Sequence, residues 1–170
     1  MNGIEMEKFH SLSITGRYIY GYLCLMHVIE HGNVMPLPQS LDIVLKEFVE
    51  SEMLDKWQDE AESYLPSYIL EERIDLNPCK SISNERREEL ALYYLSQNEP
   101  FTKVLEALLW LGISNLYVGF DTSITFTYIE TIVRLLLDYG IALPDFEKVE
   151  TCHVTQKGGW GEITKMSLFV

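Results

Sequence analysis

The sequence predicts a mainly α-helical protein: a single-domain bundle of about six helices with a short extended or β-hairpin element at the C-terminus. Three observations lead to this prediction. The chain has 170 residues, 47% of them hydrophobic, and a chain of that length buries roughly 70% of its unfolded surface on folding. Hydrophobic residues recur with helical spacing over residues 1–145. Over residues 146–170 the sequence is richer in β-branched residues, so we expect an extended or hairpin element packed on the helical domain.

The first predicted helix lies between Ser13 and His31, where a hydrophobic residue recurs about every fourth position. Ser13 is suited to the N-cap position and Gly32 to the C-terminal stop. A proline-rich turn at 35–38 follows, and Ser40 is expected to cap the next helix.

The second helical region, from about residue 41 to residue 64, changes its hydrophobic face at Ser51. Before Ser51 this face carries Leu41, Leu45 and Phe48. After Ser51 the same face carries carboxylates, at Glu52, Asp55, Asp59 and Glu62. A straight helix cannot keep one face buried through such a change, so we predict either a kink near Ser51 or a change of packing partner there.

The remaining helices are predicted from their N-terminal residues and their spacing. We expect a short helix over 68–73 and further helices over 84–97, 100–111 (extending to 118 at most) and 123–139. Ser83, Pro100 and either Asp121 or Thr122 are suited to their N-termini, and Gly140 ends the last helix. Beyond it, segments 149–155 and 162–169 read as extended. The glycine-rich stretch between them reads as a turn that exposes Trp160, and an exposed Trp is a typical contact anchor.

The charge excludes several classes of partner. With 13 basic and 26 acidic residues the chain carries a formal charge of −13, which repels nucleic-acid phosphates and anionic lipids. No stretch reaches the roughly 18 apolar residues of a membrane span, and no secretory signal is visible. Cys24, Cys79 and Cys152 are too far apart in sequence for a typical metal or disulfide pattern. We therefore expect a cytoplasmic protein with free thiols, no cofactor, and no affinity for nucleic acid or membrane.

One short motif points to catalysis. His27, Glu30 and His31 form an H-x-x-E-H pattern, which can hold zinc on one helix face with the glutamate as base. Glu106 is the candidate third ligand. A pattern with three fixed positions arises often by chance, and a histidine near a helix C-terminus suits the helix dipole. A metal-dependent hydrolase is therefore kept as an alternative, and we expect the protein not to be an enzyme.

Most of the negative charge lies in residues 42–75, which hold 11 acidic and 3 basic residues. A solvated helix face is the common explanation for such a run. The alternative is a docking surface, because like charges on one helix face repel and a basic partner would relieve that repulsion and associate faster. The candidate contact residues are Glu52, Asp55, Asp59 and Glu62, together with Trp160.

The layout resembles that of the small helical immunity proteins of bacterial polymorphic-toxin systems. The resemblance is carried by the acidic helix 41–62, the break at 65–68, the leucine-rich helices after Ser83 and Pro100, and the late 159–162 stretch. It implies a cytoplasmic protein that binds a cognate toxin domain, expected to be basic, and blocks its active site. An adaptor or regulatory subunit without a toxin partner is the other alternative.

Overall fold

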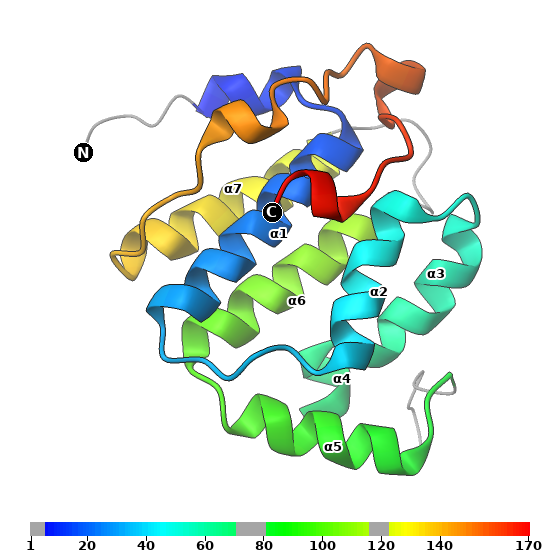
Figure 1. Cartoon of the computed structure of the whole chain (residues 1–170), viewed down its shortest axis with the longest axis vertical. Coiled ribbons are helices and arrows are strands. Elements are labelled where there is room, and N and C mark those ends of the chain that lie inside the picture. The colour runs from blue at the N-terminus through cyan, green and yellow to red at the C-terminus, as the bar shows by residue number, and fades with distance from the viewer. Residues whose placement is uncertain (1–5, 71–80, 116–122) are drawn as a thin grey trace.

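Helix α1 lies at the centre of the computed structural model, which describes residues 6–70, 81–115 and 123–170 (Figure 1). The 3₁₀ helix η1 (Met6–Ser11) leads into α1 (Ile14–His31). The predicted limits of this helix are confirmed. Ser13 Oγ accepts a hydrogen bond from Gly16 N at 3.1 Å, and Gly32 N donates to Val28 O at 2.8 Å.

Helices α2, α6 and α7 pack on α1, α5 packs on α4, and the prediction of a mainly α-helical chain is confirmed. In chain order they are α2 (Gln39–Glu50), α3 (Leu54–Ala61), η2 (Glu62–Tyr64), α4 (Pro66–Leu70), α5 (Asn84–Leu95), α6 (Glu99–Ile113) and α7 (Ser123–Asp138). Helices α6 and α7 pack against each other and against α1. This approach is close, because a Cβ atom at Gly21 of α1 would lie 3.0 Å from Leu108 Cδ1 of α6 and 3.2 Å from Ile132 Cδ1 of α7.

The predicted kink near Ser51 is confirmed as a break between two helices. Helix α2 ends at Glu50, Ser51 is extended, and its Oγ accepts from Met53 N at 2.9 Å before α3 begins. Helix α3 packs back on α2 through Trp57, whose Nε1 donates to Val44 O at 2.8 Å. Trp57 and Ala61 are thus buried, while Glu52, Asp55 and Asp59 are exposed.

Three details of the predicted helix limits are corrected. Ser40 is not the cap of α2, because Pro38 occupies the N-cap position and Ser40 Oγ instead accepts from Arg86 Nη1 at 3.1 Å. Helix α4 begins at Pro66, two residues before the predicted start, since proline is favoured in a first helical turn. Pro100 lies one residue inside α6, whose N-cap is Asn98. The predictions for Cys79, Asp121 and Thr122, and for helix beyond residues 70 and 115, fall outside the described residues.

The predicted C-terminal β-hairpin is wrong. The described residues contain no β-strand, and the C-terminal segment contains three short 3₁₀ helices, η4 (Phe146–Val149), η5 (Gln156–Gly159) and η6 (Met166–Leu168). Its backbone pairs with the N-terminal loop and with α2, through Ser13 N to Cys152 O at 2.8 Å, Val154 N to Ser11 O at 2.7 Å and Thr164 N to Val49 O at 2.9 Å. β-branched residues favour extended backbone but do not select its partner.

A buried arginine links η1 to α7. The side chain of Arg17 is 1% exposed, its Nε donates to Phe9 O at 3.0 Å and its Nη1 donates to Thr125 Oγ1 at 2.8 Å. Burial lowers the pKa of Arg17 to about 10. Because Phe9 and Thr125 belong to distant parts of the chain, this side chain fixes the N-terminal segment on the helical bundle.

Candidate functional site

Six exposed or half-buried carboxylates lie on α2, on α3 and on the loop between them, and together we call them the acidic surface. Its members are Glu47, Glu50, Glu52, Asp55, Asp59 and Glu60. The predicted residues Glu52, Asp55 and Asp59 are all exposed, and their carboxylates make no hydrogen bond or ion pair with any part of the chain that the structure describes. The fourth predicted residue, Glu62, is half-buried at the edge and accepts from Gln58 Nε2 at 2.8 Å.

The acidic surface contains a hollow of about 480 Å³ between α2 and α3. Glu47, Glu50 and Glu60 lie around it together with one cation, Lys56, and Trp57 and the 48% exposed Met53 contribute apolar surface. Partial burial raises the pKa of Glu47, and the charges of Glu60 and Glu50 raise it further. The crowding of these carboxylates is therefore unfavourable for the protein alone.

Trp160, the predicted contact anchor, lies beside the acidic surface. It lines a small hollow of about 170 Å³ together with Glu52. The side chain is half-buried against the core, not exposed as expected, and its carbonyl accepts from Thr15 N at 2.9 Å and Thr15 Oγ1 at 2.8 Å. The structure thus places Trp160 near Glu52 but offers only part of its ring to a partner.

The residues of the alternative metal site do not come together. His27 Nδ1 lies 2.9 Å from Ala142 O, and His31 Nδ1 lies 2.9 Å from His27 O, at the C-terminal end of α1. Glu106 lies in the middle of α6 and is held by Ser67 and Trp110. Within residues 6–70, 81–115 and 123–170, no three His, Cys, Asp or Glu side chains form a group that could hold a metal ion.

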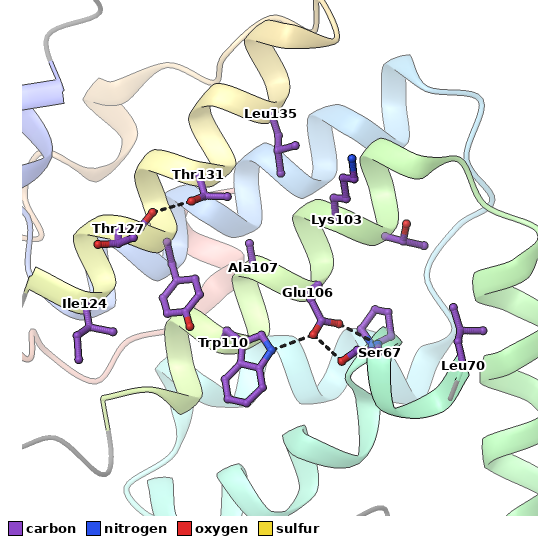
Figure 2. Close-up of a pocket in the computed structure, with 13 residues that line it drawn as sticks. Ser67, Leu70, Lys103, Glu106, Ala107, Trp110, Ile124, Thr127, Thr131 and Leu135 are labelled. Atoms are coloured by element: carbon purple, nitrogen blue, oxygen red, sulfur yellow. Dashed lines mark hydrogen bonds between the residues drawn. The ribbon is translucent and has the colours of Figure 1, made fainter. Parts of the chain in front are cut away.

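A wide groove lies between α4, α6 and α7, and the sequence did not reveal it (Figure 2). Its volume is about 800 Å³. Leu70 of α4, Ala107 and Trp110 of α6, and Ile124 and Leu135 of α7 make most of the wall apolar. These residues are hydrophobic and helical, so by sequence alone they look like ordinary core positions.

One carboxylate projects into this groove, and its orientation is fixed. Glu106 Oε1 accepts from Ser67 Oγ at 2.7 Å and from Trp110 Nε1 at 2.8 Å, and Oε2 accepts from Ser67 N at 3.0 Å (Figure 2). Lys103 on the same helix points away and its Nζ pairs with Glu99 Oε1 at 2.7 Å. Across the described residues no cationic side chain lies within 4 Å of the Glu106 carboxylate.

No protein-family model matches the chain, and neither the curated proteins nor the solved structures contain a significant match. No helix among the described residues is long and apolar enough to cross a membrane. The acidic surface and the groove are the two features of the described residues that indicate a function.

Proposed function

We propose that this protein binds a basic protein partner through the acidic surface and thereby occludes the partner's active site. The observation that carries the proposal is the set of exposed carboxylates at Glu52, Asp55 and Asp59, which have no partner within the described chain. Folded proteins seldom crowd like charges without compensation, since each close pair costs a few tenths of a kcal/mol.

The neighbouring features support a docking role for this surface. The hollow beside Trp57 adds three more carboxylates against one lysine, Lys56, and the exposed Met53 at its edge offers an apolar contact. A lysine or arginine side chain entering this hollow would meet charge complementarity at its head and apolar surface along its stem. Long-range attraction would also raise the association rate.

We further propose that the partner is a toxin domain of the bacterial polymorphic-toxin class, and that the chain is its immunity protein. This assignment rests on the resemblance in helical layout and on the acidic surface, which suits a basic toxin such as a nuclease. An adaptor role would use the same surface on a different partner. The two differ in whether binding abolishes an activity of the partner.

The test uses charge reversal with a matched control. Glu52→Lys/Asp59→Lys reverses two unpaired carboxylates of the acidic surface, whereas Asp138→Lys/Glu147→Lys makes the same change in net charge at exposed positions at the end of α7 and in the C-terminal segment. Purified wild-type protein and both variants are used to capture partners from an extract of the native host, after urea unfolding has shown that all three fold. The captured protein is then purified, and its affinity and activity are measured at several salt concentrations.

We expect the surface variant to bind about tenfold or more weakly at low salt, and with a shallower salt dependence, because reversed charges repel a basic partner. The control variant should bind like the wild type. For an immunity protein, one equivalent of wild-type protein should abolish the partner's activity. Equal affinity of the surface variant at low salt would remove the acidic surface from the binding site, and binding without inhibition would favour an adaptor.

A further inference from the structure

The groove between α4, α6 and α7 lies apart from the acidic surface and needs its own explanation. Its volume of about 800 Å³ falls in the range of roughly 300–1,000 Å³ that is typical of pockets for small organic ligands. Such pockets are mostly apolar with a few fixed polar groups, which is how this groove is built (Figure 2).

The described α7 residues that line the groove carry three hydroxyl groups, those of Thr127, Tyr128 and Thr131, and no cationic group. Thr131 Oγ1 donates to Thr127 O at 2.8 Å, and Thr127 Oγ1 donates to Ser123 O at 3.3 Å, so both hydroxyl protons are used within the helix. On the α6 side Lys103 is already paired with Glu99. An anionic ligand would therefore find no free cation among the described lining residues.

A cationic ligand, by contrast, would find Glu106. Three donors fix this carboxylate, and all three are neutral groups, so they orient its charge without cancelling it. Oε2 accepts only one of these bonds and keeps a lone pair for a further donor. A hydrogen bond to a charged group in a partly apolar setting is worth more than one between neutral groups.

We propose that this groove binds a small organic cation with an apolar body, an alkyl- or arylammonium compound, whose ammonium group contacts Glu106. The apolar part would lie along Trp110, Leu135 and Leu70. This proposal does not depend on the proposed function, because it concerns a different surface and a different class of ligand.

The test compares three probes of equal chain length: octylammonium, 1-octanol and octanoate, titrated calorimetrically into the protein at constant ionic strength. We expect octylammonium to bind about tenfold or more tightly than octanol, and octanoate to bind least, because Glu106 attracts the first and repels the last. In Glu106→Gln the preference for ammonium over alcohol should disappear while octanol still binds, which shows that the groove remains formed.

A second variant keeps the test independent of Glu106, whose loss also removes the hydrogen bonds to Ser67 and Trp110. Thr131→Phe places a ring at an exposed groove position and should abolish binding of octylammonium and octanol. Leu92→Phe adds a ring at an exposed position of α5 outside the groove and should leave binding unchanged.

Three results would overturn the proposal. The first is equal affinity for octylammonium and octanol, since Glu106 would then contribute no recognition. The second is binding that survives Thr131→Phe, because the probes would then lie elsewhere. The third is that octylammonium does not bind, whereas a synthetic amphipathic helix rich in leucine and lysine binds the wild type but not Thr131→Phe, which would assign the groove to a protein segment.

Discussion

The acidic surface and the groove both present carboxylates, but they present them in opposite ways. On the acidic surface several carboxylates are crowded and exposed, and those of Glu52, Asp55 and Asp59 have no partner within the described chain. In the groove a single carboxylate, that of Glu106, is held by three hydrogen bonds between apolar walls. The surroundings of a carboxylate therefore indicate its role better than the number of carboxylates does.

This difference predicts different modes of recognition. Exposed charges act over a distance and are screened by salt, so the acidic surface suits a large basic partner and fast association. A carboxylate that is held in place in an apolar groove binds its ligand by direct contact, and the ligand must also fit the shape of the groove. Such a site suits a small ligand. Substitutions in the two regions should therefore differ in their effect on the free energy of unfolding.

The largest effect is expected at Trp57, which joins α3 to the rest of the fold beneath the acidic surface. Its side chain is 3% exposed, and it packs against Phe48 with ring centroids 4.9 Å apart. Trp57→Ala should lower the free energy of unfolding by about 3–5 kcal/mol, because it leaves a large cavity and removes the hydrogen bond from Nε1 to the Val44 carbonyl. Urea unfolding measures this loss.

Trp110 provides the matched control, because it is half-buried in the groove. Trp110→Ala should cost clearly less than Trp57→Ala, since part of the ring is already in contact with solvent. Equal losses for the two variants would show that the groove is as much a part of the core as the α2–α3 contact is.

An intermediate effect is expected at Glu106. Glu106→Ala removes the acceptor of Ser67 N and Trp110 Nε1, which should lower the free energy of unfolding by about 1–3 kcal/mol. In Glu130→Ala, a carboxylate paired with the 70% exposed Arg134 is lost, and the expected change is within about 0.5 kcal/mol. If both variants unfold at the same urea concentration, Glu106 does not hold α4 on α6.

The smallest effect is expected at Glu47, and it has the opposite sign. Its raised pKa means that folding favours the protonated form. The associated stability is fully present below the unfolded-state pKa, near 4.5, and is lost as the pH rises through the raised folded-state pKa. Glu47→Gln should therefore stabilise the protein by a few tenths of a kcal/mol at pH 7, and this gain should vanish near pH 4.

Urea unfolding at the two pH values measures this difference. Glu150→Gln, at an exposed position of the C-terminal segment, is the control and should show little change. A gain for Glu47→Gln that persists at low pH would mean that charge repulsion is not its cause.

Much of the helical structure could be predicted because it depends on local chemistry. Ser13 caps α1 and Ser83 caps α5 as expected, each through a hydrogen bond three residues along the chain. The break at Ser51 could be predicted because an amphipathic pattern changed face there. The C-terminal hairpin was wrong because extended segments obtain their hydrogen bonds from distant residues, here Ser11, Ser13 and Val49.

The candidate sites also contain some residues that the sequence could indicate and others that it could not. The exposed carboxylates Glu52, Asp55 and Asp59 could be found from one helical face, while Glu47, Glu50 and Glu60 were missed because two helices must pack together to surround the hollow. The H-x-x-E-H pattern led to Glu106 as a metal ligand. In the structure, Glu106 instead accepts hydrogen bonds from Ser67 and Trp110 in the groove.

Spacing, capping and composition act over a few residues, so the helical class, most helix limits and the location of the negative charge could be inferred before folding is considered. Which helices enclose the groove, which donors hold Glu106 and where the C-terminal segment lies are fixed only when the chain folds. These features depend on contacts between residues far apart in the chain, and local preferences carry no information about which distant segment supplies the partner.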